Sequence, residues 1–255
     1  MSDTFEDSQS ELSSLTLNRL PELKVFNPKK FGKEHYPENK KNYLSITIVA
    51  PSNSGKNVFL KDLYLKWFKS QYDYVIIFSR TLLGQFDYIR SEIVDADIKY
   101  NEISLKAAVV YNQNRKKLGL PLKNILVIFD DISGKEYKET ELVKTIYKEG
   151  RHNSISIITL VQDYKLVNTE IRGNTNLWIL LNQKVRERSR EIAKEHLYCM
   201  SDDDVMNGMK ELDFWSSLIN KYTVKQPYNA LMVFTEPFDN EFTFQNCVLQ
   251  YKATN

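Results

Sequence analysis

Short apolar runs alternate with longer segments of helical periodicity from residue 43 onward. The apolar runs predict strands at 43–50, 74–79, 96–100, 124–130, 154–162 and 176–182, and the helical patterns between and after them cover 57–70, 103–118, 138–149 and 186–197. Several runs are apolar at both alternating positions, which indicates strands covered on both faces, as in a parallel sheet. The pattern therefore predicts an α/β fold with a mainly parallel sheet flanked by helices.

The two ends of the chain differ from this central pattern. Residues 1–42 pass from an acidic, Ser-rich stretch to a basic one without sustained periodicity, and we predict an N-terminal extension. It is either a partly disordered tail or strap over the domain, or a docking arm for a partner. Residues 43–255 form one predicted domain, with a motif-bearing core at 43–182 and an elaboration at 183–255 that holds a helical segment and a late strand at 229–236.

Composition narrows the class of protein. With 42% hydrophobic and 27% charged residues, the chain has ordinary globular composition, and a net charge of +2 means that any nucleic-acid surface must be local. The longest apolar runs are too short to span a bilayer, so we expect no membrane segment. Cys199 and Cys247 lack metal-type spacing, and we interpret them as reduced thiols of an intracellular protein.

The stretch "SITIVAPSNSGKNVFLKDLY" (45–64) is typical of a phosphate-binding loop between a strand and a helix. Gly55 would let the backbone approach phosphate closely, and Lys56 would place an ammonium on phosphate oxygens. Asn57 stands where such loops carry the Ser or Thr that ligates Mg²⁺. Its amide oxygen, an intervening water or Ser54 could each replace that hydroxyl. The candidate nucleotide contacts are Ser52, Asn53, Ser54, Gly55, Lys56 and Asn57.

Two further segments strengthen this hypothesis. "NILVIFDDIS" ends a buried strand in Asp130 and Asp131, at the edge where open α/β sheets bind ligands. Asp130 suits a Mg²⁺ contact, and Asp131 could activate the attacking water; a helix cap or turn is the alternative. "GRHNSISIITLVQ" (150–162) ends in Gln162, which could contact a γ-phosphate or simply be a loop residue.

Two arginines are candidates for an arginine finger that acts on a neighbouring subunit's nucleotide. Arg151 precedes the strand at 154–162, so in a parallel sheet it lies at the end far from its own subunit's site. Arg172 precedes the strand at 176–182, and spacing alone does not choose between the two. The candidate DNA-contacting segments are the charged stretches "NQNRKKLGLPLK" (112–123) and "KVRERSREIAKEH" (184–196). For either stretch alone, a solvated surface is the more ordinary interpretation.

The combination of "APSNSGKN", "ILVIFDD", "GRHNSISIITLVQ" and "IRGNTNLWILL" resembles the DNA-packaging ATPases of large eukaryotic DNA viruses and virophages. The poxvirus-type packaging ATPase, within the FtsK–HerA superfamily, is the reference, and the resemblance covers roughly residues 43–182. It implies a RecA-like P-loop NTPase core, ATP and Mg²⁺ as cofactors, a homo-oligomeric ring, and translocation of double-stranded DNA into a preformed capsid through a vertex or portal-like component. It also implies a location in the host cytoplasm or viral factory, with virion association as an open alternative.

The resemblance also assigns roles by position. Lys56 becomes the phosphate lysine, Asp130 the Walker B Mg²⁺ residue, Asp131 the catalytic acid and Gln162 the γ-phosphate sensor, while Arg151 and Arg172 remain candidate fingers. Another DNA motor or helicase of the superfamily is one competing hypothesis. A nucleotide-binding structural module that no longer hydrolyses ATP is the other, and Asn57 is its best support.

Overall fold

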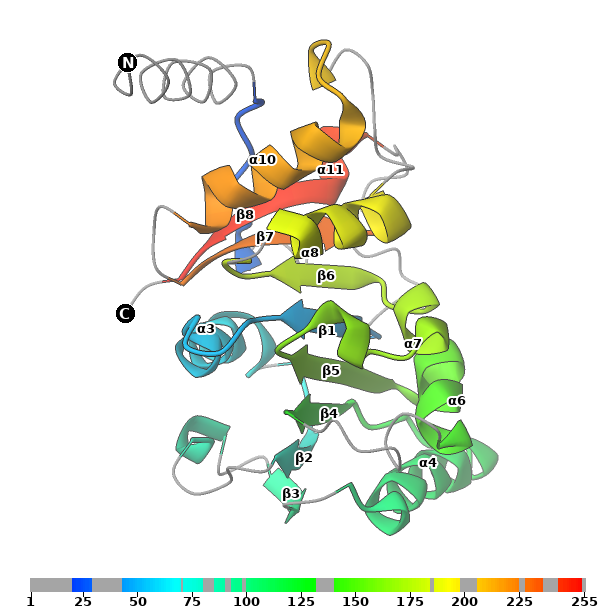
Figure 1. Ribbon diagram of the computed structural model, residues 1–255. Coiled ribbons are helices and arrows are strands. Elements are labelled where there is room, and N and C mark those ends of the chain that lie inside the picture. The colour runs from blue at the N-terminus through cyan, green and yellow to red at the C-terminus, as the bar shows by residue number, and fades with distance from the viewer. Residues whose placement is uncertain are drawn as a thin grey trace, which may run out of the picture.

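An eight-stranded sheet organises the computed structural model, which describes residues 20–28, 43–69, 71–79, 85–89, 93–97, 100–131, 140–183, 186–197, 206–224, 228–235 and 243–253. The strand order is β3-β2-β4-β5-β1-β6-β7-β8 (Figure 1). The strands are β1 (Ser45–Val49), β2 (Tyr74–Ser79), β3 (Ile93–Asp97), β4 (Ile125–Asp130), β5 (Ile155–Val161), β6 (Leu177–Leu180), β7 (Asn229–Phe234) and β8 (Val248–Lys252).

The first six strands run parallel, and β7 and β8 run antiparallel to their neighbours. The carboxyl ends of β1 to β6 therefore share one edge of the sheet, and the amino end of β7 lies at that same edge. The predicted α/β class with a mainly parallel sheet is confirmed. The strand predicted at 96–100 lies at 93–97, and β8 has no counterpart among the predicted strands.

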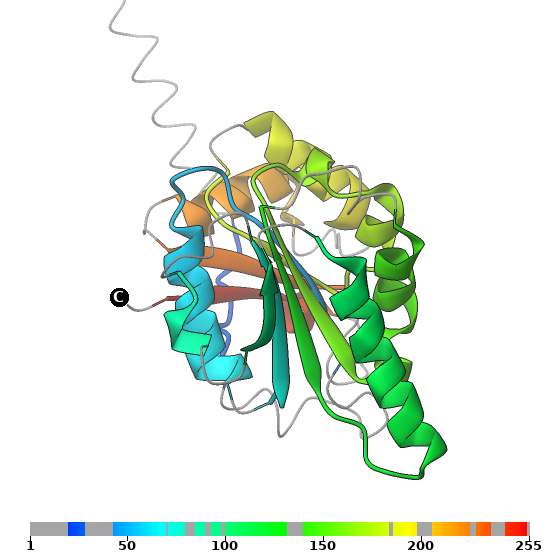
Figure 2. The same ribbon diagram turned by 90° about the horizontal axis from the view of Figure 1, so that it is seen from below.

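Helices cover both faces of the sheet. They are α3 (Lys56–Leu63) with its π-helical continuation η2 (Tyr64–Phe68), α4 (Glu102–Lys117), α6 (Glu141–Glu149), α7 (Thr169–Gly173), α8 (Arg186–Ile192) with η6 (Ala193–Leu197), α10 (Glu211–Thr223) and α11 (Phe244–Cys247), with short 3₁₀ turns η3 (Asp87–Ile89), η4 (Gly150–Asn153) and η5 (Tyr164–Leu166). In Figure 2 the strands lie between the cyan α3 and the green α4 and α6. None of the described helices has the length and apolar character needed to cross a membrane.

Each face of the sheet has its own apolar core. On one face, α4, α6, α7, α10 and α11 bury side chains against residues such as Val127, Ile157 and Trp178. On the other, α3 and η2 bury Phe59, Leu60, Leu63, Tyr64, Trp67 and Phe68 against the sheet. Successive side chains of a strand point to opposite faces, so strands covered on both sides are apolar at most positions. The buried exceptions form hydrogen bonds, and they are Ser45 and Thr47 in β1 and Ser156 and Thr159 in β5.

Part of the N-terminal extension lies against the sheet as a strap of residues 20–28. Leu20, Leu23 and Phe26 are buried. The backbone N–H of Phe26 donates to the carbonyl of Gln250 in β8 at 2.8 Å, and the N–H of Gln250 donates to the carbonyl of Lys24 at 2.9 Å. The strap thereby satisfies backbone groups at the exposed edge of β8. Residues 1–19 and 29–42 of the predicted extension lie outside the described residues.

Candidate nucleotide-binding site

The loop between β1 and α3 has the backbone geometry of a phosphate cradle. Asn53 and Gly55 both adopt positive φ, 60° and 81°, and these two left-handed residues wrap the loop before the helix begins. The carbonyl of Gly55 then accepts the first helical hydrogen bond, from Phe59 N–H at 2.9 Å. The N–H groups of the first helical turn have no partner within the helix, so they and the helix dipole favour an anion at this position.

Lys56 connects this loop to the end of β4. Its ammonium Nζ lies 2.8 Å from Asp130 Oδ1 and 2.6 Å from Asp131 Oδ2. Asp130 is 1% exposed, and its other oxygen accepts a hydrogen bond from Ser79 Oγ at 2.8 Å. Lys56, Asp130 and Asp131 were predicted from two separate motifs. They meet at the edge of the sheet where the parallel strands have their carboxyl ends. The positive charge of the lysine compensates both carboxylates.

Gln162 joins the same cluster from the end of β5. Its amide Nε2 donates to both oxygens of Asp131 at 3.2 Å, and its Oε1 accepts a hydrogen bond from Ser52 Oγ at 2.6 Å. Asp131 is itself held in a left-handed conformation, with φ of 53°, directly after the buried strand. The amide thus spans from the phosphate loop to the carboxylate.

The position of Asn57 bears on how a metal ion could be held. Its side-chain amide donates to Gln85 Oε1 at 2.9 Å, which leaves its own carbonyl oxygen available as a ligand. Ser54 Oγ is buried and has no hydrogen-bond partner among the described residues. Together with Asp130 these are hard oxygen donors of the kind that Mg²⁺ prefers. In the described part of the chain no group of three or more His, Cys, Asp or Glu side chains is arranged to hold a metal ion.

Sequence reasoning missed four residues in or beside the site. Ser79 is the last residue of the apolar run "YVIIFS", and a polar residue at a strand's carboxyl end was an available signal. Gln85 lies in a segment without periodicity, and no pattern indicated it. Tyr228 precedes β7 and packs its ring against Gly55, a contact that only the antiparallel course of β7 makes possible. Tyr88 also lies close: burial raises its pKa, and the negative charge of Asp130 raises it further, so its hydroxyl stays neutral.

The two candidate finger arginines have very different surroundings. Arg172 pairs with Glu195 at 2.8 Å and donates to the carbonyl of Val167 at 2.9 Å, while its guanidinium lies 4.8 Å from the centre of the Tyr164 ring. These contacts tie α7 to η5 and η6 within one subunit. Arg151 is exposed in η4, at the amino edge of the sheet, and no other described residue forms an ion pair or hydrogen bond with its guanidinium.

The two charged segments predicted as candidate DNA contacts also differ in their surroundings. In and around α8, Arg188 pairs with Asp163 at 2.9 Å and Arg190 with Asp213 at 2.7 Å, so these charges are compensated within the subunit. At the end of α4, Arg115 donates to a backbone carbonyl in the following loop. Lys116 and Lys117 of the same turn are exposed.

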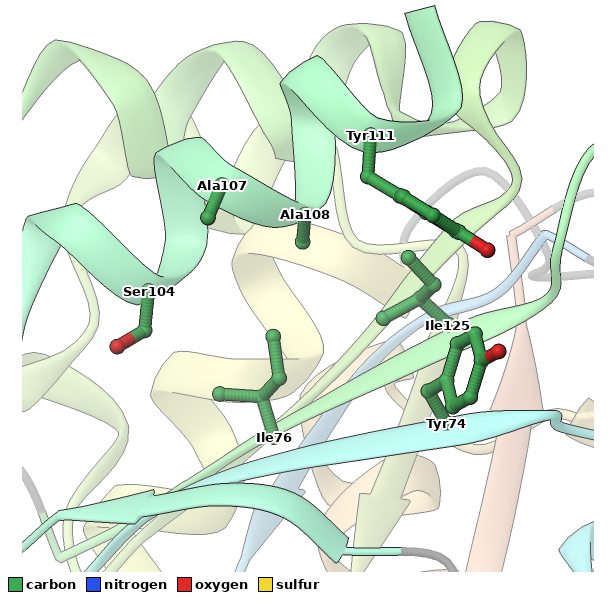
Figure 3. Close-up of a pocket in the computed structure, with 7 residues that line it drawn as sticks. All are labelled: Tyr74, Ile76, Ser104, Ala107, Ala108, Tyr111 and Ile125. Atoms are coloured by element: carbon green, nitrogen blue, oxygen red, sulfur yellow. The ribbon is translucent and has the colours of Figure 1, made fainter. Parts of the chain in front are cut away.

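A cavity of about 360 Å³ lies elsewhere, between α4 and the strands β2 and β4. Its lining is mostly apolar, and Tyr74 and Ile125 place it toward the amino ends of those strands (Figure 3). The lining residues are Tyr74, Ile76, Ser104, Ala107, Ala108, Tyr111 and Ile125. Because it carries no charged side chain and lies away from the carboxyl edge, it does not belong to the phosphate site.

The fold and this site define a P-loop NTPase. The chain belongs to the family described as "Poxvirus A32 protein", whose model matches residues 29–212, more than half of the sequence. No curated protein sequence matches it.

Solved structures show the same fold. One is the genome packaging NTPase B204 from Sulfolobus turreted icosahedral virus 2 in complex with AMPPCP, with 14% identity, a TM-score of 0.56, and coverage of 84% of this chain and 99% of that one. B204 in complex with ATP-gammaS gives 14% identity, a TM-score of 0.55 and coverage of 83% and 98%. The pCW3 conjugation coupling protein TcpA gives 15% identity, a TM-score of 0.53 and coverage of 92% and 70%. At these identities the similarity establishes a shared fold.

Proposed function

We propose that this protein is a viral genome-packaging ATPase, which couples ATP hydrolysis to the translocation of double-stranded DNA into a preformed capsid. One observation carries the proposal: Lys56 of the phosphate loop meets Asp130 and Asp131 at the end of β4, with Gln162 bonded to the same pair. Membership of the poxvirus A32 family and the fold shared with a viral genome packaging NTPase support the same activity.

Nucleotide binding would use Lys56, which lies beside Asp130 and Asp131 at the phosphate loop. Its ammonium would contact the phosphate oxygens, where the loop N–H groups also favour negative charge. A Mg²⁺ ion held by Asp130, with Asn57 and Ser54 as neighbouring oxygen donors, would supply the neutralising charge on the phosphates when bound.

Hydrolysis would use the two residues that are already hydrogen-bonded to each other. With the Lys56 ammonium on the phosphates, the Asp131 carboxylate would accept a proton from an attacking water. Gln162 bridges Asp131 and Ser52 of the phosphate loop, so its amide is positioned to orient that water and to sense the γ-phosphate. Losing a positioned general base costs about 10²- to 10⁴-fold in rate.

A ring of subunits would complete the site. Arg151 is exposed and lies at the edge of the sheet opposite its own phosphate loop. It could therefore act only on a nucleotide that is bound to a neighbouring subunit. We assign the arginine finger to Arg151, because the contacts of Arg172 hold its own subunit together. Lys116 and Lys117 offer sequence-independent contacts to DNA phosphates.

The test is ATP hydrolysis measured with and without duplex DNA, alongside the oligomeric mass. Duplex DNA should raise the rate of the assembled wild type, and Lys56→Met should reduce it at least about 10²-fold. Lys61→Met, on the exposed side of the same helix, is the matched control and should leave the rate unchanged.

Three results would contradict the proposal. A rate indifferent to duplex DNA in an assembled ring would remove the coupling to DNA. Preference for single strands, with strand separation, would identify the helicase alternative. Nucleotide binding without hydrolysis would identify the structural module instead.

A further inference from the structure

Tyr228 makes an unusually close approach to the phosphate loop. A Cβ atom placed on Gly55 would lie 2.2 Å from both Cδ1 and Cε1 of the Tyr228 ring, so the ring lies directly against the glycine backbone. Tyr228 is half-buried, and no motif of the site accounts for it. The contact bridges 173 positions of sequence, from the start of α3 to the residue before β7.

The backbone of Tyr228 is also held in an uncommon conformation. Its φ is 64°, in the left-handed region that residues with side chains rarely adopt, at a cost of about 1–2 kcal/mol. Such conformations persist where the surrounding structure fixes them, and they cluster at ligand clamps. The direction of β7 brings this residue to the carboxyl edge of the sheet, beside the loop rather than at the far edge.

The proposed catalytic groups indicate which way a nucleotide would lie across the loop. Asp130, Asp131 and Gln162 lie at the ends of β4 and β5, on one side of β1, and under the proposed function this is the end where the γ-phosphate reacts. The strands β6 and β7 lie on the other side of β1. A triphosphate cradled by the loop with its γ-phosphate toward β4 and β5 therefore directs its nucleoside toward the side from which Tyr228 comes.

We infer that Tyr228 is the nucleoside-contacting residue of this site, and that its ring presents an aromatic face to the base. The inference rests on the proposed function, because a base is present only if the loop holds a nucleotide. Stacking on an aromatic side chain tolerates any base, since every base has a π-face. Tyr228 thus sets the affinity for the nucleoside while the loop sets the affinity for the phosphates.

The experiment compares two probes by calorimetry in the presence of Mg²⁺: ATP, and inorganic tripolyphosphate, which has the phosphates without a nucleoside. Tyr228→Ala should weaken ATP binding between about 5-fold and about 150-fold while leaving tripolyphosphate binding unchanged. Tyr228→Phe retains the ring and should bind ATP as the wild type does. In a second measurement, 8-azido-ATP should photolabel the peptide that contains Tyr228.

The outcomes separate this inference from the proposed function. Two results would show that the inference is wrong while the nucleotide site stands, provided that the wild type binds ATP. In one, Tyr228→Ala binds ATP as tightly as the wild type does. In the other, Tyr228→Ala loses affinity for ATP and for tripolyphosphate to the same extent. Photolabelling confined to peptides without Tyr228 would overturn it too. If the wild type binds neither probe, the nucleotide site itself is wrong, and the inference fails with it.

Discussion

Gly55 offers a sharp test of the loop's geometry, through its replacement by alanine. Two costs are expected. The first is conformational: φ of 81° is left-handed, which costs a residue with a side chain about 1–2 kcal/mol. The second is steric: the new methyl would lie 2.2 Å from the ring of Tyr228, and overpacking of this kind costs about 1–3 kcal/mol. The sum is about 2–5 kcal/mol of lost stability in the free protein.

The chain contains a matched control for the conformational cost alone. Gly119 has φ of 66°, but a Cβ there would meet nothing within 4 Å. Gly119→Ala should therefore cost only about 1–2 kcal/mol. The difference between the two alanine variants measures the clash with Tyr228.

Urea unfolding of a double-mutant cycle provides the assay. Tyr228→Ala removes the clashing ring, so Gly55→Ala should cost about 1–3 kcal/mol less in that background than in the wild type. Comparable denaturant slopes across the four proteins would show that the same transition is being compared. Additive effects, or a Gly55→Ala cost no greater than that of Gly119→Ala, would refute the reasoning and place the tyrosine ring away from the loop.

Three further predictions concern stability and activity. Arg172→Met should lower the unfolding free energy by about 1–3 kcal/mol, because it removes the ion pair with Glu195 and the hydrogen bond to the carbonyl of Val167; unchanged stability with lost hydrolysis would instead favour Arg172 as the finger. Burial and the hydrogen bond to Asp62 raise the pKa of Tyr251 above its ordinary value of 10.0. The neutral hydroxyl therefore contributes fully to the free energy of unfolding below pH 10.0, and this contribution is lost as the pH rises above that value. Tyr251→Phe should then reduce the alkaline slope of stability by up to about 1.4 kcal/mol per pH unit, and an unchanged slope would contradict this. Asn57→Thr should preserve or raise ATP hydrolysis, whereas loss of activity would make the amide a specialised ligand.

The sequence determined the architecture because burial imposes a visible pattern. Strands covered on both faces are apolar at most positions. This pattern located the ends of β1, β2, β4, β5, β6 and β7 to within two residues. The apolar pattern was weaker in the strands at the two edges of the sheet. The strand predicted at 96–100 lies at 93–97 as β3, and β8, which has the polar Gln250 in its middle, was not predicted. The loop at 50–57 and the acidic strand end were equally visible, because their chemistry depends on residues close together in sequence.

Only the tertiary structure decided which side chains meet. The pairing of Lys56 with both aspartates, and the bond of Asn57 to Gln85, depend on loops that converge from separate strands. The distinction between Arg172 and Arg151 depends on partners in other elements, since local spacing treats the two alike. Tyr228 reaches the phosphate loop because β7 reverses direction in the sheet, and strand direction is a property of the chain's path rather than of its local pattern.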